Sequence, residues 1–283
     1  MLQTLDFLYV FNFHAPYFAD ALERLKYSIK SINDQDVNIC ISNNSPICIH
    51  DEVAKIIGDF RYKHTIYKGP FSRALGINYA VRNLVETEYF LISDIDLVYS
   101  RDHVQRLKLK VESLAPNEEN VRVINYNYNL KPVLKKSTFV GYASKTPFIR
   151  RFFSDDDYYT AHPYSSDFTI LDQLPKSPGG FAHGNGLIHT ESFMKIRGYD
   201  EEMIGYGPED TLFNLRIGKI NRLIYDNLQD TASFHLWHPR FHMIQFEKNM
   251  QIWRDRAEHY NSLDNIEYQD VMGNVHGHDW GVI

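Results

Sequence analysis

The sequence has few cysteines, no long apolar run and no surplus of basic charge, and each shortage excludes a class of protein. Only Cys40 and Cys48 occur among 283 residues, which excludes a disulfide scaffold. Apolar runs stay shorter than the roughly 18 residues of a membrane-spanning helix, so we expect no transmembrane segment. The formal net charge of −6 argues against a broad nucleic-acid-binding surface, so we expect no nucleic-acid partner.

The N-terminal stretch MLQTLDFLYVFNFH has no basic residue ahead of its apolar run and places Asp6 inside that run. This pattern predicts a first β-strand rather than a signal peptide. We therefore expect a cytoplasmic protein, and peripheral attachment to the inner face of a membrane stays open.

The composition suits a chain with a sizeable core. At 283 residues and 43% hydrophobic content, the chain fits one large domain or two closely joined ones. Aromatic residues reach 14%, which serves a core but also a groove that stacks a ring-shaped ligand. No internal repeat and no low-complexity linker marks a domain boundary.

Strands and helices alternate along the first hundred residues. Leu22, Leu25, Ile29 and Ile32 recur at helical spacing between two apolar, strand-like runs, and FSRALGINYAVRNLV predicts a later helix capped by Ser72. This alternation predicts an α/β fold with parallel strands and crossover helices. Further on we expect strands at 120–130 and 137–144, a loop at 152–168 and a partly helical tail at 240–283.

Polar residues follow several of the predicted strands. In parallel α/β sheets, ligands bind beyond the carboxyl ends of the strands. We therefore expect these side chains to lie on one rim: Asn12, Asn43, Asn44, Asp94 and Asp96.

Asp94 and Asp96 end the apolar run EYFLIS two residues apart. On an extended chain they share a side and repel each other, unless a cation or several donors neutralise them. Mg²⁺ or Mn²⁺, held by oxygen ligands and shared with a phosphate, would explain the pair. A turn in which the Asp side chains cap backbone amides is the alternative.

Histidines cluster in HLWHPRFH, where His235 and His238 stand three apart after an apolar run. A pair at this spacing can bind one cation, and chance clustering among 13 histidines is the alternative. The run Asp155–Asp157 offers further carboxylates, but adjacent side chains diverge, so we predict a solvated loop there.

An acidic segment, RGYDEEMIGYGPEDTLFNLRIGK, spans residues 197–219. It places Tyr206 between two glycines, with Glu209 and Asp210 at the start of a predicted helix. The helix dipole alone favours acidic residues there. Alternatively, one carboxylate faces the crevice as a general base, with Tyr206 as a stacking lid.

Phe71 and Arg73 stand at another predicted helix start. A ring and a guanidinium there can hold a base and its phosphates. Ordinary packing and a surface arginine are the alternative.

In their order, these segments resemble the nucleotide-sugar glycosyltransferases of the GT-A fold. The order is FSRALGIN, YFLISDIDLVYS, the pair Gly179-Gly180, GYDEEMIGYGPEDTLFNLR and HLWH, within about residues 5–240. The sequence looks closest to the β-1,4-galactosyltransferases and to bacterial chondroitin-polymerase domains of the family 2 type.

The resemblance implies a GT-A (Rossmann-like) mixed α/β sheet with flanking helices in a single large domain at 1–240. Its nucleotide-binding half would span about 1–100 and its acceptor and metal half about 101–240. A partly helical C-terminal extension would follow at 241–283.

The resemblance also implies roles for individual residues. Asp210 would be the catalytic base, with Glu209 binding the acceptor, and a divalent cation, Mn²⁺ or Mg²⁺, would be held by Asp96, His235 and His238. The nucleotide-sugar would contact Phe71, Arg73, Asn43, Asp94, Tyr206 and Gly180. The sequence departs from the resembled pattern in having His235 for a Met, Tyr206 for a Trp and Pro208 for a Gly.

The implied function is metal-dependent, inverting transfer of a hexose, with Gal or GalNAc favoured, from a UDP-sugar to a hydroxyl of a carbohydrate acceptor. Synthesis of a surface polysaccharide or oligosaccharide is the implied setting, and a lipid-linked acceptor stays open. Two alternatives also stay open: a nucleotide-sugar hydrolase that uses the same crevice, and a non-catalytic nucleotide- or glycan-binding module.

Overall fold

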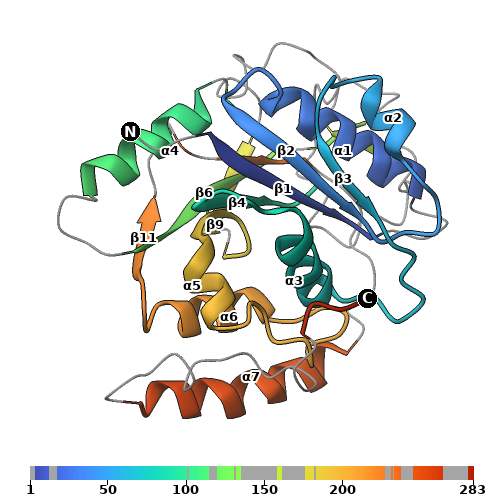
Figure 1. Ribbon diagram of the computed structural model, residues 1–283. Helices are drawn as coiled ribbons and strands as arrows, with labels where there is room; N and C mark the ends of the chain where they lie inside the picture. Colours follow the sequence, from blue (N-terminus) through green and yellow to red (C-terminus); the bar gives the residue numbers. More distant parts are fainter. Residues whose placement is uncertain are drawn as a thin grey trace.

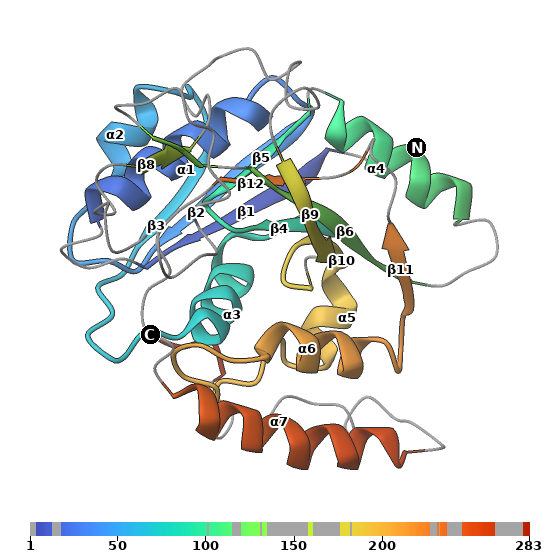
Figure 2. The same ribbon diagram turned by 180° about the vertical axis from the view of Figure 1, so that it is seen from behind.

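A computed structural model shows a mixed β-sheet with helices on both faces (Figures 1 and 2). The described residues are 4–12, 18–100, 102–114, 120–130, 132–134, 158–160, 176–181, 183–226, 231, 233–236, 245–263 and 280–283.

The described strands are β1 (Leu5–Phe11), β2 (Val37–Asn43), β3 (Arg61–His64), β4 (Tyr89–Ser93), β5 (Leu97–Tyr99), β6 (Val121–Leu130), β7 (Pro132–Leu134), β8 (Tyr158–Thr160), β9 (Lys176–Phe181), β10 (Gly186–His189), β11 (Arg222–Asp226) and β12 (Ser233–His235). The described helices are α1 (Phe18–Ile32), α2 (His50–Ala54), α3 (Arg73–Leu84), α4 (His103–Leu114), α5 (Thr190–Lys195), α6 (Glu209–Ile217) and α7 (Phe246–Asn261).

The main sheet has the order β3-β2-β1-β4-β10-β6-β12-β5, and β9 and β11 also pair with β6. The pairs β1–β2, β1–β4 and β2–β3 are parallel, as the alternation of the first hundred residues predicts. Strand β10 then joins antiparallel to β4. The expected mixed α/β sheet is therefore confirmed: β1 to β4 form one parallel part, and β6 also pairs in parallel with β11 and β12.

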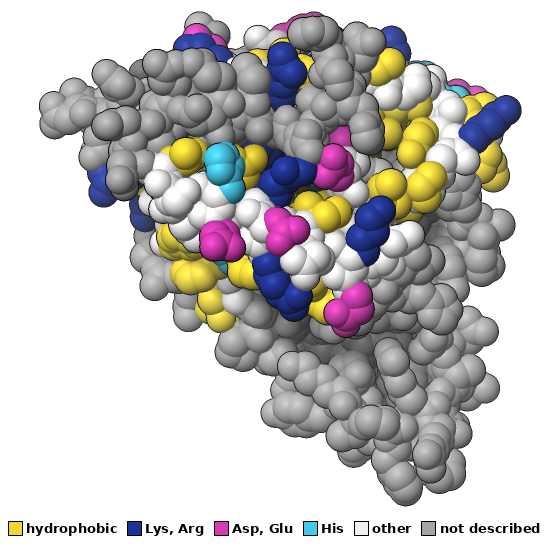
Figure 3. Space-filling view, turned by 90° about the horizontal axis from the view of Figure 1, so that it is seen from below, with side chains coloured by type: hydrophobic (Ala, Val, Ile, Leu, Met, Phe, Trp, Pro, Cys, Tyr) yellow, Lys and Arg dark blue, Asp and Glu magenta, His cyan; other side chains and the backbone are white. Residues whose placement is uncertain are grey.

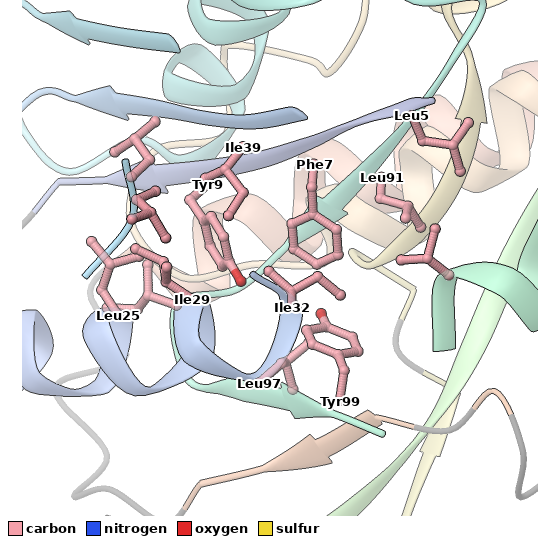
Figure 4. Packing of buried hydrophobic residues seen from close by; sticks show 14 of the residues in the cluster. Leu5, Phe7, Tyr9, Leu25, Ile29, Ile32, Ile39, Leu91, Leu97 and Tyr99 are labelled. Atoms are coloured by element: carbon pink, nitrogen blue, oxygen red, sulfur yellow. The ribbon is translucent and has the colours of Figure 1, made fainter. Parts of the chain in front are cut away.

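One face of the sheet is covered by α1, α2 and α4 (Figure 1). Alternate residues of β1, including Phe7 and Tyr9, point to this face, where they meet Leu25, Ile29 and Ile32 of α1 (Figure 4). Burial of each such side chain contributes about 1.5–3 kcal/mol. The helical spacing thus places these α1 residues on one side of the helix, where they pack against the sheet as one continuous layer.

The opposite face is covered by α3, α5 and α6, with α7 outside them as a further layer (Figure 1). Leu8 of β1 and Phe90 of β4 pack there against Phe193 and Phe213. Tyr260 of α7 and Trp280 join the same cluster, and the C-terminal end lies beside α3.

Several local predictions can be compared with the structure. The expected strand at 120–130 is confirmed as β6, whereas Tyr158–Thr160, within the predicted loop, forms β8 and pairs with β7. Tyr and Thr favour strands, which explains this difference. The expected strand at 137–144 and the run Asp155–Asp157 lie outside the described residues. In the described ranges, no helix is long and apolar enough to cross a bilayer.

Candidate active site

Polar residues meet beyond the carboxyl ends of β1, β2 and β4. The backbone N–H of Asn44 donates to the carbonyl of Phe11 at 2.7 Å, which joins the ends of β1 and β2. A pocket of about 110 Å³ opens beside them, and its lining includes Asn12, Asp94 and Asp96. Phe71 and Arg73 from the start of α3 line the same pocket, so five residues predicted to lie at the rim or the site converge there.

Ser72 fixes the start of α3. Its side chain accepts a hydrogen bond from the backbone N–H of Leu75 at 3.2 Å, which confirms the predicted N-cap. The cap places Arg73 in the first helical turn, at the edge of the pocket.

Arg73 joins two carboxylates from distant parts of the chain. Its Nε and Nη2 donate to Asp94 Oδ1 at 3.1 and 3.0 Å, and its Nη1 donates to Asp210 Oδ1. Nη2 also donates to the carbonyl of Gly184 at 3.1 Å. The guanidinium therefore fixes Asp94, at the end of β4, relative to Asp210, at the start of α6.

Asn185 also belongs to the candidate site, although the sequence did not predict it. Its amide Nδ2 donates to Asp94 Oδ2 at 2.9 Å, while its Oδ1 accepts from the backbone N–H of Asp94 at 2.8 Å. The sequence did carry one signal that could have identified Asn185: it is a polar residue between Gly184 and Gly186, directly before a buried strand.

Gly184 allows the backbone to approach both charged groups. A Cβ at this position would lie 2.5 Å from Arg73 Nη2 and 2.5 Å from Asp210 Oδ2. The predicted Gly180 differs, because it lies in β9 opposite Asn127 and a Cβ there would meet open space. Its role in nucleotide-sugar binding stays a prediction.

Glu209 and Asp210 occupy the first turn of α6, as predicted. Burial and the neighbouring charge of Asp210 raise the pKa of Glu209 to about 8. Burial also raises the pKa of Asp210, against the opposing effect of Arg73. Near neutral pH, Glu209 therefore carries its proton and can donate, while Asp210 beside Arg73 is the better proton acceptor.

The loop before α6 is tied to the pocket and to α7. The backbone N–H of Gly205 donates to the carbonyl of Phe71 at 2.8 Å. Asn249 of α7 donates to the carbonyls of Ile204 and Tyr206 at 2.7 and 3.0 Å. The rings of Phe71 and Tyr206 are 44% and 51% exposed, so both remain accessible to a ligand.

Asp96 and His235 come together because β5 and β12 pair, with His235 opposite Leu97. His235 Nε2 lies 3.7 Å from Asp96 Oδ1. Carboxylate oxygen and imidazole nitrogen at this separation fit a shared divalent cation. Among the described residues no group of three or more metal-binding side chains occurs, and the third predicted ligand, His238, lies outside them.

Asn43 is placed differently from the other predicted site residues. Its Nδ2 donates to the carbonyl of Ile47 at 2.7 Å and to the Tyr62 hydroxyl at 2.9 Å, and its Oδ1 accepts from the backbone N–H of Ser45 at 3.0 Å. The buried amide therefore shapes the turn after β2. A contact of Asn43 with a nucleotide stays a prediction.

The fold is the GT-A glycosyltransferase fold. Staphylococcus aureus TarS 1–349, in complex with UDP-GlcNAc, superposes with a TM-score of 0.54 at 13% identity, over 95% of this chain and 69% of that chain. Mannosyltransferase PcManGT from Pyrobaculum calidifontis, in complex with GDP-Man and Mn²⁺, gives a TM-score of 0.50 at 14% identity, over 92% and 62%. A further S. aureus TarS structure gives 0.51 at 13% identity, over 95% and 41%.

These solved neighbours are GT-A-like glycosyltransferases, and at such low identity the likeness concerns the fold. The chain spans less than the full length of each of them. Its sequence matches no established family profile and no curated protein.

Proposed function

We propose that the chain is a metal-dependent, inverting glycosyltransferase that moves a hexose from a UDP-sugar to a hydroxyl of a carbohydrate acceptor. The observation that carries this proposal is the linkage of Asp94 and Asp210 through Arg73 at a pocket beyond β4. The fold supports it, since neighbours of that fold were solved with UDP-GlcNAc or with GDP-Man and Mn²⁺. The motif resemblance favours Gal or GalNAc as the sugar and a surface glycan as the product.

The donor would lie in the pocket between α3 and β4. The exposed Phe71 ring offers a stacking surface for the base, and the amide-fixed Asp94 offers an acceptor for donor hydroxyl groups. Asp96, His235 and His238 would hold the cation, which when bound supplies positive charge next to the diphosphate leaving group.

Asp210 would act as the general base. It takes the proton of the acceptor hydroxyl, whose oxygen forms a bond to C1 of the sugar as the bond from C1 to the diphosphate oxygen breaks. The electron pair of that bond leaves with UDP, and a single displacement inverts the anomeric centre. Protonated Glu209 can donate a hydrogen bond to the acceptor, and the raised pKa of Asp210 gives the base a stronger affinity for the proton.

A thermal unfolding titration tests the shared site. We expect UDP and Mn²⁺ together to raise the unfolding midpoint by more than the sum of their separate effects, because both bind the native state at one place. The absence of any shift with UDP, under Mn²⁺ or Mg²⁺, would contradict the proposal.

Product analysis with a panel of UDP-sugars then separates the alternatives. Acceptor-dependent release of UDP with a new glycosidic product supports transfer, whereas free sugar released at full rate without acceptor identifies a hydrolase. UDP binding without turnover of any donor identifies a binding module. An Asp210→Asn variant that keeps full transfer would exclude Asp210 as the base.

A further inference from the structure

Arg122 of β6 is one of the largest fully buried side chains of the described chain. Its Nη1 donates to the carbonyls of Val123 and Leu187 at 2.6 and 3.2 Å, and its Nη2 to those of His183 and Asn185 at 3.0 and 3.1 Å. Its Nε donates to Asn214 Oδ1 at 3.1 Å. All three guanidinium nitrogens are therefore hydrogen-bonded, and three of the accepting carbonyls belong to residues 183–187.

Residues 183–187 lead into β10 and carry the two groups that hold the candidate active site. The carbonyl of Gly184 accepts from Arg73, and the amide of Asn185 makes both hydrogen bonds to Asp94. Arg122 binds the carbonyls on either side of Gly184, those of His183 and Asn185. The path of this backbone, and with it the placement of Arg73 and Asp94, therefore depends on one buried guanidinium.

Among the described residues, the hydrogen-bond partners of the Arg122 guanidinium are all neutral. Within the described ranges no carboxylate forms an ion pair with it, and burial lowers its pKa to about 10, so it remains a cation at neutral pH. A buried cation with neutral partners is costly, whereas an apolar side chain would fill similar space without that penalty. Stabilisation of a nearby anion offsets this cost, and the positive charge of Arg122 lowers the pKa of Asp210.

We propose that Arg122 is a positioning residue for glycosyl transfer: its guanidinium fixes residues 183–187 against Arg73 and Asp94. The kinetic part of this inference rests on the proposed function, whereas the structural part stands without it.

Several charged and titratable groups, from α6 itself and from other elements, act on Asp210. They are Arg73 of α3, Asp94 after β4, His183 before β10, Tyr199 after α5 and Glu209 of α6. Removal of the Arg122 cation keeps the charge of each of these groups, and a displacement of Arg73 away from Asp210 acts in the same direction as the lost Arg122 charge. The ionised carboxylate loses a favourable interaction, and the pKa of Asp210 rises.

Hydrogen exchange of the full chain tests the structural part. In Arg122→Met we expect amide exchange in residues 183–187 to become at least about tenfold faster, because the carbonyls lose their common donor. Arg216→Met is the matched control, since Arg216 is also fully buried but donates to the carbonyl of Ile196. That control should increase exchange near Ile196 and leave 183–187 protected. Unchanged exchange of 183–187 in Arg122→Met would overturn the proposal.

Steady-state kinetics across pH test the functional part. In Arg122→Met we expect kcat/KM for the donor to fall at least about 100-fold, with both a lower kcat and a higher donor KM, because Asp94 would contact the donor and Arg73 holds Asp210. The acidic limb of the kcat profile should move to higher pH. Arg122→Lys keeps the charge and should restore the position of that limb, although not the whole rate, because an ammonium cannot make the same five hydrogen bonds.

The outcomes separate the two proposals. If the wild type turns over no donor, the proposed function fails and the exchange experiment still decides the structural role of Arg122. If exchange at 183–187 rises but kcat and its acidic limb stay in place, Arg122 is structural only and the positioning role is excluded.

Discussion

At the start of α6, two adjacent carboxyl groups have different surroundings. Asp210 is paired with Arg73, whereas Oε2 of the buried Glu209 makes no hydrogen bond within the described part of the chain. Burial therefore raises the pKa of Glu209 from its usual 4.5 to about 8. The folded protein retains a proton there that the unfolded chain releases.

Glu209→Gln should change how stability depends on pH. In the wild type, the protonated Glu209 side chain contributes to the free energy of unfolding. This contribution is fully present below pH 4.5 and is lost as pH rises to about 8, since the raised pKa favours the protonated folded state. Gln carries no titrating proton. The variant should therefore unfold at a temperature similar to that of the wild type at pH 5, and at least about 4 °C above that of the wild type at pH 8.5. Thermal unfolding across pH measures this difference.

Glu247→Gln is the control for this prediction, because Glu247 also lies in a first helical turn but is exposed. It should leave the pH dependence unchanged. Parallel curves for Glu209→Gln and the wild type would contradict the raised pKa.

Gly184→Ala should disturb the site without unfolding the chain. The new Cβ would lie 2.5 Å from Arg73 Nη2 and from Asp210 Oδ2, so both groups must move. We expect donor turnover to fall about 100-fold. Gly58→Ala is the matched control, since nothing lies within 4 Å of a Cβ there. Equal turnover in the two variants would exclude a close-packing role for Gly184.

Individual residues could be predicted from the sequence where chemistry and spacing pointed to them. Arg73, Asp94 and Asp210 were predicted from their residue types at helix starts and strand ends, and the structure brings them together. Asn185 and Arg122 were not, because their importance arises from neighbours far away along the chain. No local pattern reports such a contact.

At the scale of elements, α7 acts on the loop that precedes α6. Asn249 is buried and supplies two hydrogen bonds to the carbonyls of Ile204 and Tyr206, and a Cβ on Gly207 would lie 2.7 Å from the Asn249 side chain. The tail predicted only as partly helical therefore holds the backbone around the predicted lid residue Tyr206. The division of the chain at 240/241 stays a prediction.

Asn249→Ala should loosen this loop. Two part-buried hydrogen bonds are lost, which together cost about 1–3 kcal/mol of unfolding free energy. Amide exchange in residues 204–207 should also become faster. Gln251→Ala, at an exposed position of the same helix, should change neither the unfolding free energy nor the amide exchange of residues 204–207. Denaturant unfolding and hydrogen exchange give the two readings, and equal behaviour of both variants would contradict the role of Asn249.

Elements with strong periodicity could be predicted, while their partners could not. The spacing of Leu25, Ile29 and Ile32 predicted a helix, and these residues are buried in α1. The antiparallel placement of β10 between β4 and β6 could not be predicted from the local sequence pattern, because strand pairing depends on the whole sheet.

At the scale of the whole molecule, two apolar clusters share one sheet. Leu8 and Phe7 are neighbours in β1 but belong to opposite clusters. We therefore expect both layers to unfold together. On the outer face that α7 occupies, the described Lys, Arg, Asp and Glu side chains are interspersed with hydrophobic ones (Figure 3). Positive and negative side chains are mixed among these described residues, and neither forms a large continuous patch.

Trp280→Ala tests how far the C-terminal residues support the second cluster. Trp280 is 8% exposed, packs in that cluster and lies under Arg82, whose guanidinium carbon is 5.3 Å from the ring centroid. We expect a loss of about 3–5 kcal/mol in unfolding free energy, the range for large aromatic truncations. Val282→Ala, at an exposed position, should stay within about 0.5 kcal/mol of the wild type. A similarly small loss for Trp280→Ala would show that this tail is not part of the core.

The link between Arg73 and Asp210 also sets an order of events during synthesis. The two residues are 137 positions apart, so at about 5–20 residues per second the ribosome makes Arg73 on the order of ten seconds before Asp210. During that interval the parallel strands β1 to β4 can already associate, and Arg73 can meet Asp94 but not Asp210. The nascent chain can therefore form the Arg73–Asp94 contact first, and the Arg73–Asp210 contact forms only after α6 has emerged.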